Sequence, residues 1–173
     1  SNLQIIADFI SLYYGEVGES VSTVSGQGRT VTFKPSVFDV PASGVEADLV
    51  AVMMPFAPQF EAVFLTISSA CTSSGFRALR AKDIWEHAVV IQDVFNLIFK
   101  AHVVICDFTG KNPNVFYEAG IAHTLGKHVV PITQSIADIP FDIQHHRFLP
   151  YLNNAEGRDE LGAGLKARFQ TLR

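Results

Sequence analysis

A chain of 173 residues, 48% of them apolar and 17% charged, is long enough and apolar enough to bury the core of one ordinary domain, which excludes a disordered chain. The formal net charge of -4 comes without a cluster of Lys and Arg, which argues against a nucleic acid or a membrane surface as the main partner. No stretch reaches the roughly 20 apolar residues that a membrane span needs, and Cys71 and Cys106 lie inside apolar runs, so we expect a cytoplasmic protein with reduced, buried thiols.

Residues 1–46 differ in character from the rest of the chain. Apolar side chains recur at helical spacing from Leu3 to Tyr13, a stretch rich in Gly, Ser and Thr follows, and Thr30 to Phe33 forms a short strand candidate. We interpret this part as an N-terminal extension that packs on the main domain or ends an upstream module. The main domain is predicted over residues 47–173.

In the main domain, apolar strands and amphipathic helices alternate. Short apolar runs bounded by turn signals predict strands at 49–53, 76–79, 102–108, 128–133 and around 147–149. Apolar residues at intervals of three and four predict helices at about 60–75, 89–100, 112–125 and 155–172. Asn112 followed by Pro113 is a strong helix start signal. The alternation predicts an α/β fold with a three-layer, doubly wound parallel sheet, of the flavodoxin-like or Rossmann-like kind.

The strand ends are where a site is expected, because ligands of open parallel sheets bind beyond the carboxyl ends of the strands. Four groups follow strand ends: residues 53–56, Arg80 with Asp83, Asp107 with the loop after it, and Thr133 with Gln134. The segment from Asp107 to Asn114 is the most polar of them. It leads directly into a helix N-terminus, which favours an anionic or hydrogen-bond-accepting ligand.

Glu118 is the first candidate for a functional side chain. With Ile121, Ala122 and Leu125 it forms a stripe along one side of its helix, so its carboxylate should lie in line with an apolar face. A carboxylate in such a place is costly unless it is paired or used in chemistry. The position favours a functional role over the alternative, a Glu at the helix rim that bonds a loop amide.

The aspartates are less decisive. Asp93 lies opposite the main apolar stripe of its helix, which favours a solvated face, although apolar neighbours flank it. Asp107 ends a buried strand, where a functional role and hydrogen bonds to loop amides are equally open. Asp83 is a candidate N-cap for a turn before Trp85. The His and Cys residues lack metal-ligand spacing, so we expect no metal site. The sequence also has no Walker loop and no Gly-x-Gly-x-x-Gly loop.

Four segments carry a resemblance to a known family. They are VMMPF at 52–56, IQD at 91–93 ahead of AHVVICD at 101–107, NPNVFYEAGIAH at 112–123, and GKHVV at 126–130. The long run at 112–123 is the most specific of them. On these segments the chain from Val50 to about Tyr151 resembles the nucleoside 2-deoxyribosyltransferase-like family, which is related in fold to TIR-type domains.

The resemblance implies a role for each candidate. Glu118 corresponds to the nucleophile, which attacks the anomeric carbon of a nucleoside and forms a glycosyl-enzyme intermediate. Asp93 occupies the place of an Asp that contacts the base and helps it to leave. The other residues expected to bind substrate are Asp107, Asn112 and Asn114 at the sugar, Phe56 and Trp85 stacked on the base, and Asp83 at its strand end.

Three functional hypotheses follow. The first is an enzyme that cleaves or transfers at the N-glycosidic bond of a small-molecule nucleoside or nucleotide, without a metal or bound cofactor. The second is a TIR-like hydrolase that uses Glu118 to cleave the nicotinamide bond of NAD. The third is a non-catalytic nucleotide-binding sensor or assembly module, which Met54 and the N-terminal extension favour. A homo-oligomer is compatible with all three, because relatives assemble.

Overall fold

The computed structural model describes residues 36–83, 90–144 and 146–172. The chain divides into two units, Ser1–Val37 and Phe38–Arg173, and the second carries every element discussed below. The predicted N-terminal helix and the strand candidate at Thr30–Phe33 lie outside the described residues, as does Trp85.

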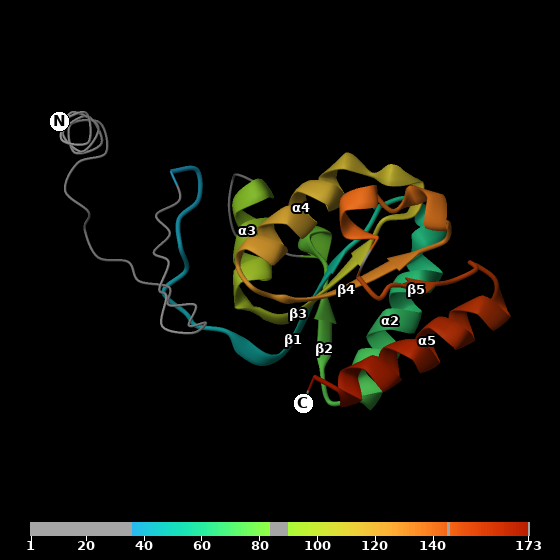
Figure 1. Ribbon diagram of the computed structural model, residues 1–173. Coiled ribbons are helices and arrows are strands. Elements are labelled where there is room, and N and C mark those ends of the chain that lie inside the picture. The colour runs from blue at the N-terminus through green and yellow to red at the C-terminus, as the bar shows by residue number, and fades with distance from the viewer. Residues whose placement is uncertain (1–35, 84–89, 145, 173) are drawn as a thin grey trace, which may run out of the picture. The chain divides into compact units, whose positions relative to one another are not determined.

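The described part of the second unit is built on a five-stranded parallel sheet in the order β2-β1-β3-β4-β5 (Figure 1). The strands are β1 (Glu46–Met53), β2 (Arg77–Leu79), β3 (Ala101–Asp107), β4 (His128–Thr133) and β5 (Leu149–Pro150). At the centre, Val50 of β1 pairs with Val103 of β3, and Met53 pairs with Cys106. This strand order is that of flavodoxin-like folds, so the predicted doubly wound parallel sheet is confirmed.

Helices cover both faces of the sheet (Figure 1). On one face lie α2 (Glu61–Ser73) and α5 (Ala155–Gln170), and on the other lie α3 (Val90–Lys100) and α4 (Pro113–Thr124). The continuous apolar runs of the central strands follow from this arrangement, since side chains alternate between the faces. In β1, Val50 and Val52 pack on the α2 and α5 side, whereas Ala51 and Met53 pack on the α3 and α4 side.

The elements predicted in the main domain are present and differ from the predictions mainly at their ends. The largest shift is at the start of β1, which was predicted from residue 49 and begins at Glu46. The last strand, predicted around 147–149, is β5 at Leu149–Pro150. Both cysteines are buried free thiols, as predicted. None of the helices in the described residues is long and apolar enough to cross a membrane.

Candidate active site

A cavity of about 280 Å³ opens at the carboxyl ends of β1, β2 and β3. Its polar and aromatic lining residues are Phe56, Asn112, Asn114, Tyr117 and Glu118, and the buried side chain of Met54 also lines it. The first turns of α3 add the apolar side chains of Ile91 and Val94. The chain leaves β1 toward β2 at one side of this cavity and reaches α4 from β3 at the other. The cavity therefore lies at the switch point of the sheet, where doubly wound folds bind their ligands.

Glu118 is the buried ionisable group of this cavity. It lies on the inner face of α4, whose buried residues are Val115, Glu118, Ala119 and Ala122. Of the predicted stripe, Ala122 is therefore buried as expected, whereas Ile121 and Leu125 are only partly buried against the core. Only 8% of Glu118 is exposed, and its carboxylate makes no hydrogen bond or ion pair with the described residues. Burial raises the pKa of this carboxyl group from its ordinary 4.5 to about 7. At neutral pH the group is therefore poised between its charged and neutral forms.

The start of α4 presents two amide side chains to the cavity. Asn112 is the N-cap of the helix, as predicted, because its Oδ1 accepts the backbone N–H of Asn114 at 2.9 Å. Asn114 is exposed and lines the cavity one turn before Glu118. Its amide can both donate to and accept from a ligand.

Two exposed aromatic rings border the cavity. Phe56, which the sequence predicted as a base-stacking residue, is 55% exposed, and Tyr117 is 53% exposed. Tyr117 was not among the predicted site residues. Its sequence signal is the position directly before Glu118, within the motif at 112–123. Exposed aromatic faces beside a cavity suit the flat face of a base.

Asp107 ends β3 with a fully buried carboxylate that is bonded on both oxygens. Its Oδ1 accepts the backbone N–H of Thr109 at 3.0 Å and the hydroxyl of Thr109 at 2.6 Å, and its Oδ2 accepts the hydroxyl of Tyr151 at 2.6 Å. Burial raises the pKa of Asp107, and these hydrogen bonds oppose the rise. Of the two readings of Asp107, the structure shows bonding to the following loop. Asp107 is not among the described residues that line the cavity.

Asp93 is buried, with 4% exposed, so the expectation of a solvated face is wrong. The reason is that this side of α3 faces β1 and β2 across a separate cavity of about 180 Å³, which Asp93 lines with Arg77 and Lys100. Ile91 and Val94, on a different side of the same helix, line the cavity of Glu118. The structure thus does not bring Asp93 and Glu118 into one cavity.

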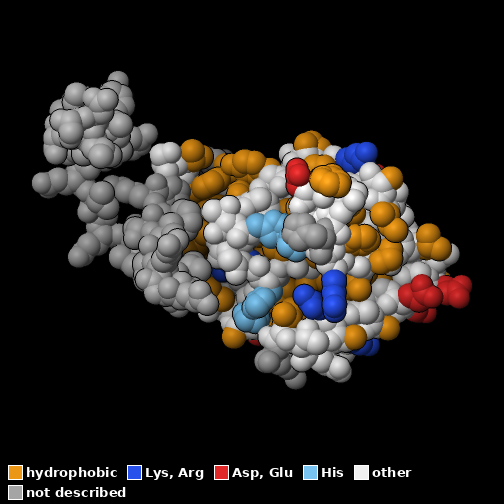
Figure 2. Space-filling view, viewed as in Figure 1, with side chains coloured by type: hydrophobic (Ala, Val, Ile, Leu, Met, Phe, Trp, Pro, Cys, Tyr) orange, Lys and Arg blue, Asp and Glu red, His pale blue; other side chains and the backbone are white. Residues whose placement is uncertain are grey.

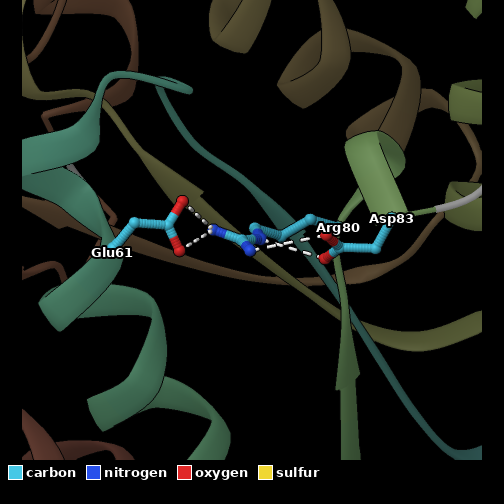
Figure 3. Close-up of polar contacts among 3 residues, drawn as sticks. All are labelled: Glu61, Arg80 and Asp83. Carbon is cyan, nitrogen blue, oxygen red and sulfur yellow. Dashed lines mark hydrogen bonds and ion pairs between the residues drawn. The ribbon is translucent and has the colours of Figure 1, made fainter.

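Asp83 belongs to an ion-pair cluster that follows β2 (Figure 3). The buried guanidinium of Arg80 donates to both carboxylate oxygens of Glu61 at 3.2 Å, and on its other side to Asp83 at 3.0 and 3.4 Å. The same group lies over the ring of Phe64, 3.6 Å from its centroid. Asp83 therefore holds Arg80, and Ala81 rather than Asp83 contributes to the described lining of the cavity.

Within the described residues, no three His, Cys, Asp or Glu side chains lie together in a way that could hold a metal ion. On the face shown in Figure 2, Lys and Arg side chains lie in separate small groups. The polar groups that the described lining of this cavity offers to a ligand include the carboxyl group of Glu118 and the side-chain amides of Asn112 and Asn114.

Comparison with solved structures identifies proteins with the same fold. A 2-deoxyribosyltransferase of Leishmania mexicana superposes with a TM-score of 0.52 at 15% identity, covering 69% of this chain and 97% of the other. The TIR domain of a Toll-related receptor of Hydra magnipapillata superposes with a TM-score of 0.54 at 17% identity, covering 73% and 98%. This chain shares their fold. No family model matches the sequence, and no curated protein is similar to it at a significant level.

Proposed function

We propose that this chain cleaves the N-glycosidic bond of a nucleoside or nucleotide with Glu118 as the nucleophile. The observation that carries the proposal is the buried carboxylate of Glu118, without a partner among the described residues, at the switch-point cavity. The fold shared with a 2-deoxyribosyltransferase supports chemistry of the same class. Both lines of support are compatible with the role that the resemblance of residues 112–123 implies for Glu118.

Cleavage of this bond makes the anomeric carbon and the ring oxygen of the sugar positively charged in the transition state. A buried carboxylate such as that of Glu118 stabilises that charge more strongly than an exposed one does in water. One oxygen of Glu118 forms a bond to the anomeric carbon while the carbon–nitrogen bond breaks; the electron pair of the broken bond leaves with the base, which takes up a proton from water. The oxygen of water or of an acceptor hydroxyl then bonds to the same carbon and gives its proton to the solvent, while the bond to Glu118 breaks and its electron pair returns to the carboxylate.

The neighbouring groups fit the two halves of such a substrate. The amide of Asn114 lies one turn from Glu118 and can hydrogen-bond sugar hydroxyls, whereas Phe56 and Tyr117 offer ring faces to the base. Asp93 has no part in this proposal, because it lines the separate cavity between α3 and the strands β1 and β2.

The test is the release of free base from a panel of deoxynucleosides, ribonucleosides, nucleoside monophosphates and NAD, followed by chromatography. The parent is compared with Glu118→Gln, which keeps the side-chain size, and with Glu156→Gln, which changes an exposed Glu on α5. We expect base release that falls by about 10³-fold or more in Glu118→Gln and is unchanged in Glu156→Gln.

Each other outcome has a defined meaning. Equal release by Glu118→Gln and the parent would exclude Glu118 as the nucleophile. Release from NAD alone would replace the proposal with the TIR-like hydrolase. Binding of a panel member without any release would replace it with a non-catalytic binding module, in which Met54, buried at the cavity, is the first residue to examine.

A further inference from the structure

Four residues, Asp107, Thr109, Gln134 and Tyr151, form a closed ring of hydrogen bonds at the carboxyl ends of β3, β4 and β5, which the backbone N–H of Gln134 completes. Gln134 donates its backbone N–H to the hydroxyl of Thr109 at 3.0 Å and its side-chain amide to the hydroxyl of Tyr151 at 3.1 Å. Each of these hydroxyls then donates to one oxygen of Asp107, both at 2.6 Å. The proton of each hydroxyl is thereby committed, and both point toward the carboxylate. Such short bonds to a charged acceptor are the strong kind.

The ring holds the first residues of the loop that leads to the cavity. Phe108, which follows Asp107, donates its N–H to the carbonyl of Ile132 at 3.0 Å, so a backbone bond to β4 also holds the start of this loop. Thr109 is held twice by Asp107, through its backbone N–H and its hydroxyl. The loop ends at Asn112, the N-cap of α4, which lines the cavity.

The same loop has a backbone conformation that its own sequence does not favour. Gly110 has a φ of 73° and Lys111 a φ of 55°, and Lys111 is the non-glycine residue with positive φ in the described parts of the chain. A side chain at positive φ costs about 1 kcal/mol, so this conformation persists only where surrounding contacts hold it. Asp138 supplies one such contact, because its carboxylate accepts the N–H of Gly110 at 2.8 Å.

We propose that Gln134 and Tyr151 are positioning residues of the Glu118 site, which act through Asp107 and Thr109 to fix the loop from Phe108 to Asn112 and so the start of α4. The inference rests on the proposed function for its catalytic consequence. Neither residue reaches the described lining of the cavity. Their effect on a substrate passes through the loop, whose last residue caps the helix that carries Asn114 and Glu118.

The decisive variant is Tyr151→Phe, which removes one hydroxyl and leaves the buried ring in place. We expect kcat for base release to fall about tenfold with KM little changed, because the groups that act on the transition state are misplaced while the apolar lining remains. Thr66→Val is the matched control, because it removes a hydroxyl that bonds a backbone carbonyl in α2, far from the loop in sequence, at 3.0 Å. It should leave kcat unchanged.

A second pair of variants separates positioning from general stability and covers a Tyr151→Phe protein that does not fold. Thr109→Val keeps the shape of Thr109 but removes the hydroxyl shared by Asp107 and Gln134, and should lower kcat about tenfold. Thr109→Ser restores the hydroxyl and should restore kcat. Equal kcat in Thr109→Val and Thr109→Ser would overturn the proposal.

A readout that needs no catalysis keeps this inference distinct from the proposed function. Amide hydrogen exchange of Thr109, Gly110 and Asn114 should quicken about tenfold in Tyr151→Phe and stay unchanged in Thr66→Val. Unchanged exchange, or the same change in both variants, would overturn the proposal. If the parent releases no base, quickened exchange still establishes that the ring fixes this loop, and only the proposed function is lost.

Discussion

Two buried carboxylates at the carboxyl edge of the sheet have opposite surroundings. Asp107, at the end of β3, accepts three hydrogen bonds on its two oxygens. Glu118, inside α4, accepts none from the described residues and faces a cavity. Both have a raised pKa because both are buried, so the direction of the shift alone does not distinguish them. The bonds distinguish them: a saturated carboxylate holds structure, whereas an unsaturated one remains available for a ligand.

The largest effect on stability is expected at Asp107. Asp107→Asn keeps the shape but replaces one acceptor oxygen with an amide donor, which then faces the committed proton of Thr109 or Tyr151. We expect the free energy of unfolding to fall by about 4 kcal/mol, measured by urea denaturation, because buried polar groups lose their partners. Asp159→Asn, at an exposed position of α5, should change it by less than about 0.5 kcal/mol. Similar losses in Asp107→Asn and Asp159→Asn would refute the structural role of the Asp107 carboxylate.

Removing the carboxyl group of Glu118 should raise the free energy of unfolding, whereas removing that of Asp107 lowers it, and the gain at Glu118 depends on pH. The pKa of the folded state, about 7, lies above the ordinary 4.5, so the folded protein keeps this proton while the unfolded chain loses it. Stability is therefore lost as the pH rises from about 4.5 to 7, by about 3 kcal/mol from this group alone. Glu118→Gln removes that loss.

The variant should thus unfold at a higher free energy than the parent at pH 8, by up to about 3 kcal/mol, and at the same free energy at pH 4. Taking the difference between the two proteins at each pH cancels the titration of the other groups. A variant that is less stable than the parent at pH 8 would mean that the carboxylate of Glu118 has a partner that stabilises it.

The sequence predicted the parts of the site that depend on local spacing. Glu118 follows from the 3.6-residue period of α4, and Asn112 from the capping preference of a residue before Pro113. Asp93 was expected on a solvated face because the period of α3 does not reveal that β1 and β2 cover its flank. Tyr151 was missed because its bond to Asp107 joins residues 44 apart in sequence, which no local pattern encodes.

Arg80 extends the comparison to a buried cation. Because its guanidinium binds Glu61 on one side and Asp83 on the other, it is saturated like Asp107 (Figure 3). Arg80→Lys leaves a single ammonium that cannot reach both carboxylates in this geometry, so we expect a loss of about 2 kcal/mol in urea denaturation. Arg77→Lys is the control, since Arg77 pairs with Glu46 and Asp48 at the exposed surface and should cost about 0.5 kcal/mol. Equal losses would mean that burial adds nothing to the Arg80 cluster.

The smallest effects are expected at two glycines that lie on either side of Glu118 in sequence. Neither Gly110 nor Gly120 would bring an added Cβ within 4 Å of another group, so packing does not decide either substitution. Gly110 has a φ of 73° in the loop, and Gly110→Ala should lower the free energy of unfolding by about 1 kcal/mol. Gly120 lies inside α4, where Gly120→Ala should raise it by about 0.5 to 1 kcal/mol. Opposite signs in urea denaturation would show that the loop before the site needs a left-handed backbone at Gly110, whereas the helix that carries Glu118 accepts a side chain at Gly120. A gain in Gly110→Ala would contradict the left-handed conformation of this loop.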